Sequence, residues 1–332
     1  MDQPDPNGCN RRNFLKTTAL STAALAMNNP LSALAGDVMN AAKLPTREFG
    51  STGIHLSIIG MGGIVVKDAD QQHANRIVAE FVERGVNYFD VAPSYGDAEL
   101  KLGPALEPFR KNSFLACKTD QKTREGTQAD LKKSMEHLRT DHFDLYQLHA
   151  VTDVAKDIDA VFAKGGAMET FIEAKKSGQV RFLGFSAHSV EAAFAAMDRF
   201  DFDSILFPVN FATWEKGGFG PQIMERAQAR GLARLALKAL ARQQWPDDHT
   251  PERKLYPKVW YQPLTDRHQA ELALRFTLTQ PVTAALPPGE EALFRLALDI
   301  APQFTPVTES ELSELKTLAA DLNPVFRAGK PG

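Results

Sequence analysis

The sequence contains very little cysteine and no surplus of positive charge. Its 332 residues include two cysteines, Cys9 and Cys117, which excludes a disulfide framework and a thiolate-rich zinc or iron–sulfur site. The 38 lysines and arginines are outnumbered by 41 acidic residues, for a net charge of −3, which argues against binding to a nucleic-acid backbone. What is present, 43% hydrophobic residues in a chain of this length, is enough for a substantial buried core.

Residues 1–35 have the three-part layout of an export signal. A basic opening at 11–16 reads Arg-Arg-Asn-Phe-Leu-Lys, an apolar run follows at 19–27, and small residues at 33–35 suit a signal peptidase. The opening resembles a twin-arginine signal, although Asn10 stands where serine or threonine is usual. The apolar run is too short and too polar to span a membrane, so we expect no permanent membrane anchor. We therefore predict export by the twin-arginine translocase and a periplasmic location.

The rest of the chain is interpreted as a linker at 36–45, one domain at 46–322 and a tail at 323–332. The domain opens with residues 46–57, where two glycines suit a tight hairpin. After it, short apolar runs alternate with segments of helical periodicity. The expected strands lie at 56–63, 86–92, 113–119, 143–149, 180–186, 204–210, 233–238 and 282–286. The expected helices lie at 69–84, 99–109, 127–138, 168–177, 190–199, 222–230 and 267–279.

Each expected strand is continuously apolar, as strands covered on both faces are. Eight strand–helix units in one domain indicate a closed (β/α)8 barrel. A doubly wound open sheet is the weaker alternative, because no Gly-x-Gly-x-x-Gly turn follows the first strand.

Two segments interrupt the alternation. Residues 214–220 carry a glycine pair, and residues 241–263 carry four aromatic residues and several prolines. A long structureless connection in a compact domain is usually functional. We expect the second segment to lie over the active-site mouth, with aromatic packing onto the barrel as the alternative.

Residues with acid–base chemistry stand at the ends of three successive strands. Asp90, Lys118 and His149 end the second, third and fourth expected strands, and Tyr95 follows Asp90 on the next loop. In a barrel these ends lie side by side, on the face where active sites gather. Each residue alone has a plainer interpretation: a loop-stabilising pair, a capping charge or a buried imidazole. Together they indicate an acid–base set.

The chemistry of that set follows from its residue types. A tyrosine is a poor acid at neutral pH, but an adjacent ammonium lowers its pKa by favouring phenolate. We therefore expect Tyr95 to transfer a proton and Lys118 to lower its pKa. Asp90 would keep Lys118 charged, and His149 would bind the substrate oxygen.

These motifs resemble the aldo-keto reductase family. The family's tetrad falls on Asp90, Tyr95, Lys118 and His149. Its Asp-x-Ala-x-x-Tyr-Gly…Glu…Leu-Gly motif matches residues 90–103, its helix-to-strand signature matches 137–149, and its hairpin matches 47–53. The motifs occur in the family's order, and the resemblance covers about 46–299. It implies a (β/α)8 TIM barrel with an N-terminal β-hairpin and a C-terminal helical extension.

The resemblance also implies a nicotinamide dinucleotide lying across the barrel mouth without a Rossmann fold. Its carboxamide would be held by Ser186 and Asn210, at the ends of the fifth and sixth strands. The family's usual Ser-Asn pair is here Ser-Ala with His188 next, so His188 joins the candidates. The seventh strand lacks the common Ser-Pro-Leu and brings Lys238, which would reach the pyrophosphate as a point charge. A plain surface lysine is the alternative.

The adenosine end of the cofactor site departs most from the family. The loop after the eighth strand reads Pro-Pro-Gly-Glu-Glu at 287–291, shortened and acidic, with Gly289 as its candidate contact. Arg295 would pair with a 2′-phosphate, and Glu290 and Glu291 would oppose it. The resemblance favours NADP(H), and NAD(H) stays open.

We predict an NAD(P)(H)-dependent oxidoreductase that acts on a small carbonyl or alcohol, with Tyr95 as general acid/base. A non-catalytic nucleotide-binding or regulatory protein on the same barrel is the alternative, which the intact tetrad disfavours. Metal binding through His149 and His188 lacks a further ligand at suitable spacing, so we predict no metal site.

Overall fold

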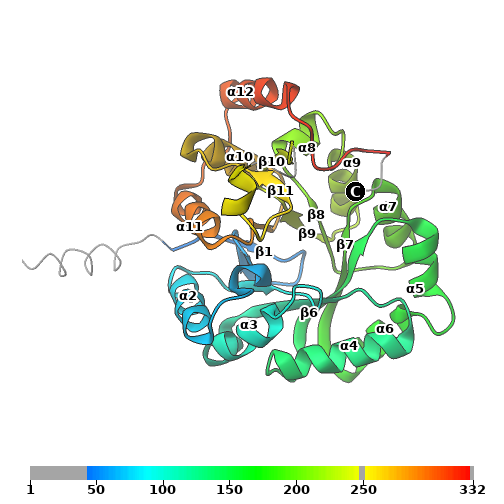
Figure 1. Ribbon diagram of the computed structural model, residues 1–332. Coiled ribbons are helices and arrows are strands. Elements are labelled where there is room, and N and C mark those ends of the chain that lie inside the picture. Colours follow the sequence, from blue (N-terminus) through cyan, green and yellow to red (C-terminus); the bar gives the residue numbers. More distant parts are fainter. Residues whose placement is uncertain (1–42, 247–250, 330–332) are drawn as a thin grey trace, which may run out of the picture. The chain divides into compact units, whose positions relative to one another are not determined.

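The computed structural model describes residues 43–246 and 251–329 (Figure 1). The predicted signal at 1–35 therefore lies outside the described residues. The expected hairpin is present as β1 (Thr46–Glu48) and β2 (His55–Ser57), with Thr46 opposite Ser57. Phe49 in its turn is fully buried and packs against Phe114 and Phe182, at ring-centroid distances of 5.0 and 5.3 Å. The hairpin thus closes the end of the barrel where the strands begin.

Eight parallel strands form one sheet, in the order β12-β9-β8-β7-β6-β5-β4-β3. Their bounds are β3 (Met61–Gly62), β4 (Tyr88–Asp90), β5 (Phe114–Thr119), β6 (Phe143–Val151), β7 (Val180–Ala187), β8 (Ser204–Pro208), β9 (Ala233–Leu237) and β12 (Ala284–Leu286). A parallel bridge between Ile59 and Ala285 brings the two edges of the sheet together. The (β/α)8 barrel predicted from the alternation is confirmed.

The first expected strand, 56–63, is in fact two elements. Residues at its start pair in the hairpin, whereas Met61 and Gly62 pair with β4 in the barrel. The chain changes direction at Ser57, whose hydroxyl donates to the carbonyl of Ile59 (2.7 Å) and whose N–H donates to Asn87 (2.7 Å). A continuous apolar run does not reveal such a turn, because both halves are buried.

Helices surround the sheet, as Figure 1 shows. The longer ones are α2 (Gln71–Glu83), α3 (Ala98–Leu106), α4 (Arg124–His137), α6 (Ala167–Ser177), α7 (Val190–Arg199), α9 (Pro221–Ala229), α10 (Arg267–Thr279), α11 (Glu291–Ile300) and α12 (Glu309–Ala320). Short elements are α5 (Ala160–Phe162), α8 (Phe211–Glu215), η1 (Gly63–Val66), η2 (Glu107–Asn112), η3 (Val154–Asp159), η4 (Pro251–Leu255) and η5 (Ala301–Gln303). Within residues 43–246 and 251–329, no helix combines the length and hydropathy needed to cross a bilayer.

Local sequence explains where these helices begin. Asp70, Thr123, Ser189 and Asp266 each accept a hydrogen bond from a backbone N–H of the first turn. Such caps satisfy donors that have no partner inside the helix. The C-terminal extension is α12, which starts with a full capping box and packs against α8 and α10.

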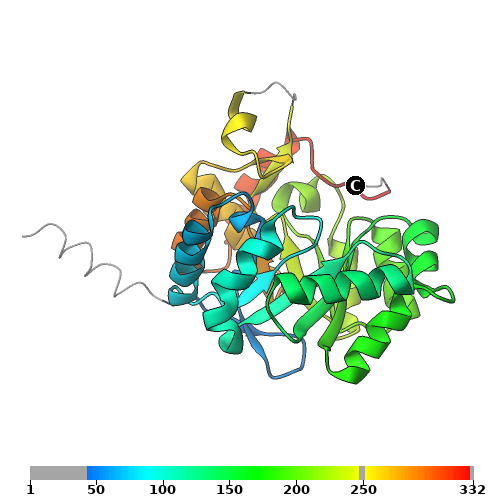
Figure 2. The same cartoon turned by 60° about the horizontal axis from the view of Figure 1, so that its bottom comes forward.

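The aromatic segment after β9 has more structure than its composition predicted. It contains an antiparallel pair, β10 (Ala241–Gln244) and β11 (Tyr261–Pro263), with η4 between them. Trp245 Nε1 donates to the carbonyl of Val259 (3.4 Å), which ties the two arms together. In Figure 2 this yellow segment and the blue β1–β2 hairpin lie at opposite ends of the barrel.

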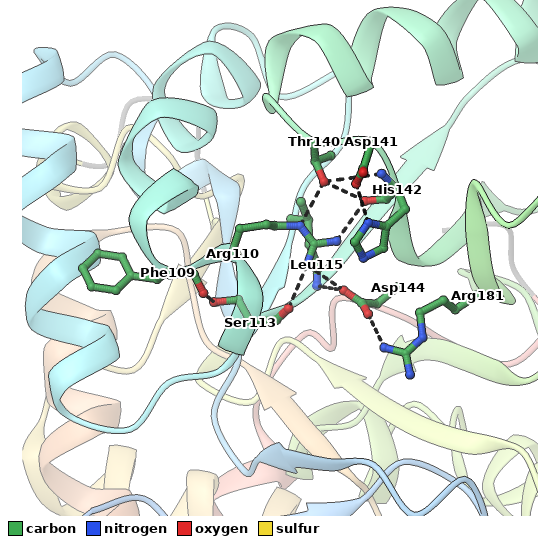
Figure 3. Close-up of polar contacts among 9 residues, drawn as sticks. All are labelled: Phe109, Arg110, Ser113, Leu115, Thr140, Asp141, His142, Asp144 and Arg181. Atoms are coloured by element: carbon green, nitrogen blue, oxygen red, sulfur yellow. Dashed lines mark hydrogen bonds and ion pairs between the residues drawn. The ribbon is translucent and has the colours of Figure 1, made fainter.

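An ion-pair network fixes the start of β6 (Figure 3). Asp144, which is buried, accepts from Arg110 (3.0 Å), from Arg181 (2.6 Å) and from the backbone N–H of Leu115 (2.9 Å). Arg110 also donates to the carbonyls of Ser113 and His142. These residues stand where β5 and β6 begin, at the opposite end of the strands from their carboxyl ends. The network is therefore structural.

Candidate active site

The four tetrad residues predicted from the sequence meet at the carboxyl ends of β4 to β6. Lys118 Nζ forms an ion pair with Asp90 Oδ1 and donates to the carbonyl of Val91 (3.4 Å). The other oxygen of Asp90 accepts from the Tyr88 hydroxyl (3.1 Å) and from Gln147 Nε2 (2.9 Å). Asp90 and Lys118 are each about 1% exposed, so the pair is fully enclosed.

Tyr95 joins this pair from the loop after β4. Its ring centroid lies 5.2 Å from Lys118 Nζ and 5.7 Å from the ring of His149, which it meets edge-on at 75°. Burial raises the pKa of Tyr95, and the Lys118 ammonium opposes that rise without cancelling it. The effect expected of Lys118 is present, but it is smaller than desolvation. Tyr95 is therefore a neutral phenol at neutral pH, able to donate a proton.

Lys118 stays charged in this enclosed position. Burial lowers the pKa of a lysine, but the adjacent Asp90 carboxylate, with smaller contributions from Tyr95 and Cys117, outweighs that effect and the pKa of Lys118 is raised. The site thus holds an ammonium beside Tyr95.

The ring of His149 has a partner that the sequence did not single out. Its Nδ1 lies 2.8 Å from Asp120 Oδ1 and 3.3 Å from the hydroxyl of Ser94. Burial raises the pKa of Asp120, but the hydrogen bond and charge of His149, together with Ser94 and Lys122, outweigh this, and the pKa is lowered overall. The available signal was position alone: Asp120 follows Thr119, the last residue of β5.

Lys238, at the end of β9, points toward the same edge. Its φ of +67° lies in the left-handed region, uncommon for a residue with a Cβ and often a mark of function. Its Nζ lies 5.1 and 5.2 Å from the ring centroids of Trp260 and Tyr261. Burial, with a smaller contribution from Lys118, lowers the pKa of Lys238 to about 8. No carboxylate pairs with it among residues 43–246 and 251–329.

A narrow cavity of about 70 Å³ connects these groups. Asp90, Tyr95 and Lys238 line one side, and residues 258–261 cover the other. This volume is well below the roughly 300 Å³ of pockets that enclose a whole ligand. Because residues 258–261 line the cavity, the aromatic segment lies over the site mouth, as expected, and it also packs on the barrel.

The proposed carboxamide contacts are positioned unequally. Ser186 Oγ accepts from the backbone N–H of Ala150 (2.7 Å), and Asn210 Oδ1 accepts from that of Thr213 (2.9 Å). Asn210 Nδ2 is buried and has no hydrogen-bond partner in the described part of the chain, so it is free for an acceptor such as a carboxamide oxygen. His188 packs against Phe326, at 4.8 Å between ring centroids, and burial lowers its pKa to about 3.

Arg295, the candidate for a 2′-phosphate, already has two acidic partners. It forms ion pairs with Glu80 (2.6 Å) and with Glu291. Glu290 instead accepts from the backbone N–H of Lys258. Gly289 lines the cavity, and a Cβ there would lie 2.3 Å from Ile64 Cγ2, so the close approach of this loop requires glycine.

The described residues contain no group of three or more histidine, cysteine or acidic side chains suited to a metal ion. Of the two histidines considered as metal ligands, His149 is paired with Asp120 and His188 packs on Phe326.

Comparison with known proteins agrees with this geometry. The model of the Aldo/keto reductase family matches residues 58–257, more than half of the chain. The uncharacterized oxidoreductase YqkF of Bacillus subtilis (strain 168) is 25% identical over 300 residues, 82% of this chain and 95% of that protein. L-galactose dehydrogenase of Arabidopsis thaliana is 23% identical over 172 residues, 47% of this chain and 53% of that protein.

Among solved structures, the holo form of aldo-keto reductase AKR11C1 from Bacillus halodurans has the same fold. It aligns with a TM-score of 0.66 and 24% identity, over 85% of this chain and 98% of that one. The barrel, the position of the tetrad and the match to the family model lead to one conclusion. The chain belongs to the aldo/keto reductase family.

Proposed function

We propose that this protein is an exported NAD(P)(H)-dependent reductase of small carbonyl compounds, in which Tyr95 donates the proton. The observation that carries the proposal is the contact of Tyr95 with both the buried Lys118 and the ring of His149. A neutral phenol beside a permanent ammonium is suited to protonate an oxygen on which negative charge develops.

The chain's own residues divide this task. Asp90 holds the Lys118 ammonium in place, and Tyr88 and Gln147 fix the remaining Asp90 oxygen. Lys118 makes phenolate less costly to form when Tyr95 has given up its proton. When bound, the nicotinamide supplies or takes up a hydride at the substrate carbon. In the reverse direction, phenolate takes the proton of an alcohol.

Asn210, Ser186 and Lys238 are proposed to hold the nicotinamide dinucleotide. The free Asn210 Nδ2 suits the carboxamide oxygen, and the Lys238 ammonium suits the pyrophosphate. His188, Gly289 and Arg295 complete the candidate set. The family resemblance favours NADP(H), whereas the two carboxylates on Arg295 favour NAD(H), because a 2′-phosphate would have to displace them. Mass spectrometry of nucleotide released by heat from the purified protein distinguishes the two.

The test of the proposed chemistry is Tyr95→Phe. Loss of the proton donor should lower carbonyl reduction at least about a hundredfold, the lower end of general-acid contributions. Nucleotide affinity, measured by fluorescence titration, should stay near the wild-type value. A Tyr95→Phe variant that keeps most of the wild-type activity would remove Tyr95 from the mechanism. If the wild type itself reduced carbonyls no faster than that variant and only slowly, the non-catalytic nucleotide-binding alternative would be favoured.

A further inference from the structure

The ring of His149 makes its polar contacts through only one of its two nitrogens. Both polar contacts of the ring, with Asp120 and with Ser94, are made at Nδ1. Nε2 has no hydrogen-bond partner in the part of the chain that the structure describes, and the side chain is only 16% exposed. Nε2 is therefore the nitrogen left for a ligand beside Tyr95.

A carboxylate can only accept hydrogen bonds, so the contact with Asp120 requires a proton on Nδ1. In a neutral imidazole the other nitrogen then carries a lone pair and no hydrogen. Such an Nε2 cannot donate to a carbonyl oxygen. It can accept a hydrogen bond from a hydroxyl group.

The charged groups near Asp120 do not compete with its pairing to His149 Nδ1. Lys122, which is close in sequence, forms its ion pair with Asp157 (3.1 Å), and its charge also contributes to the low pKa of Asp120. His188 is held neutral by burial, and Lys118 is paired with Asp90. The low pKa of Asp120 keeps it ionised throughout the neutral range.

We propose that Asp120 is a positioning residue that makes His149 a hydrogen-bond acceptor and thereby selects substrates with a hydroxyl next to the reacting carbon. The substrate class is hydroxy carbonyl compounds and the corresponding vicinal diols. The carbonyl oxygen takes the proton of Tyr95, while the neighbouring hydroxyl donates to His149 Nε2. A simple aldehyde cannot donate to that nitrogen, so it loses a hydrogen bond that a hydroxyl-bearing substrate makes. This inference rests on the proposed function.

The first measurement reads the ring directly and needs no activity. Histidine labelled with nitrogen-15 is incorporated into the full chain, the spectrum is recorded at pH 8, and His149 is assigned with His149→Gln. The nitrogen shifts should show a protonated Nδ1 and a bare Nε2. In Asp120→Asn the amide can donate to Nδ1, so the Nε2–H tautomer should gain population. A wild-type ring with its hydrogen on Nε2 would overturn the proposal.

A second Asp–His pair on the surface provides a matched control. Asp141 Oδ1 lies 2.7 Å from His142 Nδ1, and Asp141 is largely exposed. Asp141→Asn should change the shifts of His142 alone and leave turnover unchanged. If Asp141→Asn altered His149 as much as Asp120→Asn does, the effect would not be local and the proposal would fail.

The second measurement compares 2-hydroxypropanal with propanal, which differ by one hydroxyl. Wild-type kcat/KM should favour the hydroxy aldehyde at least tenfold, and Asp120→Asn and Asp120→Ala should bring the ratio close to one. An equal ratio in wild type and variants would overturn the assigned substrate class. If neither aldehyde is reduced by the wild type, the proposed function fails, whereas the nitrogen shifts still decide the role of Asp120.

Discussion

Lys118 is the residue on which both charge and stability of the site depend. Its ammonium neutralises the buried Asp90 and opposes the rise in the pKa of Tyr95. These two effects can be measured separately, because neutralising Asp90 changes the stability of the fold, whereas the effect on Tyr95 changes only the pKa of its hydroxyl.

Lys118→Met should raise the pKa of Tyr95 further. Reduction needs protonated Tyr95, so the rate falls as pH rises through that pKa, and the alkaline limb of the profile should move to higher pH. The maximum rate should also fall, since a weaker acid donates less readily. The pH–rate profile of carbonyl reduction checks both changes, and an identical profile would make Lys118 purely structural.

The same substitution leaves the Asp90 carboxylate buried and unpaired, which costs about 3–5 kcal/mol of stability. Lys118→Met/Asp90→Asn removes that charge, so it should recover most of the loss in denaturant unfolding. Because the Asp90 carboxylate raises the pKa of Tyr95, its removal should also move the alkaline limb part of the way back toward the wild-type position. A double variant as unstable as Lys118→Met would show that the loss of stability does not come from the unpaired Asp90 carboxylate.

The sequence pointed to Asp90, Lys118 and His149 because each stands at or near the carboxyl end of a strand of recognisable pattern, with Tyr95 on the loop after the first. Asp120 escaped notice because it lies one residue past the strand, where acidic residues are common in loops. The net rise in the pKa of Tyr95 also escaped, since desolvation depends on how completely the loop encloses the ring. Neither property is a matter of spacing along the chain.

Among the elements, the starts of β5 and β6 are joined by one buried carboxylate with two unequal partners. Arg110 is mostly buried and spans four acceptors, whereas the Arg181 side chain is 49% exposed. The network therefore offers a matched pair of substitutions, one inside and one at the surface.

Arg110→Ala should destabilise the protein by about 3 kcal/mol, the lower part of the range for a broken buried pair, because Arg181 still partly compensates Asp144. Arg181→Ala should cost about 0–1 kcal/mol, since an exposed pair is screened by solvent. The midpoints of urea unfolding compare the two. Equal losses would mean that the buried and exposed halves of the network contribute alike.

The element pattern was predictable from sequence where one period held throughout. The seven helices expected between strands are all present, as are the eight strands of the barrel. The strands could be recognised because a sheet covered by helices needs continuous apolar runs in its strands. The split at Ser57 and the β10–β11 pair were not predictable. A turn between two buried strands leaves no polar signal, and the pairing of Ala241 with Pro263 joins residues 22 positions apart along the chain.

Residues 258–261 form a cover over the site, and this cover could determine how an exported enzyme keeps its cofactor. Lys258 ties the cover down twice: its backbone N–H donates to Glu290, and its Nζ donates to the carbonyl of Val65 (2.9 Å). Trp260 and Tyr261 close over Lys238 from the same segment. A segment held down in this way slows exchange of anything beneath it.

If the protein is exported, as we propose, this cover has to keep the nucleotide bound. The space outside the cytoplasmic membrane holds no substantial pool of free nicotinamide, whereas the twin-arginine route carries folded proteins that can be loaded beforehand. We therefore predict that the nucleotide is retained and turns over in place, oxidising one small alcohol and reducing a second carbonyl. Residence for about an hour requires roughly nanomolar or tighter affinity at ordinary association rates.

Extensive dialysis of the purified protein, followed by absorbance and mass measurement, tests retention. The wild type should emerge with nucleotide bound, and Lys258→Met, which loses the tie to Val65 but keeps the backbone bond to Glu290, should emerge with less. A wild-type protein that emerges empty and binds added nucleotide only at micromolar concentrations would contradict retention. The carbonyl chemistry of Tyr95 would be unaffected by that result, because it depends on the buried tetrad and not on the cover, and the electrons would then have to come from a donor that reaches the site at each turnover.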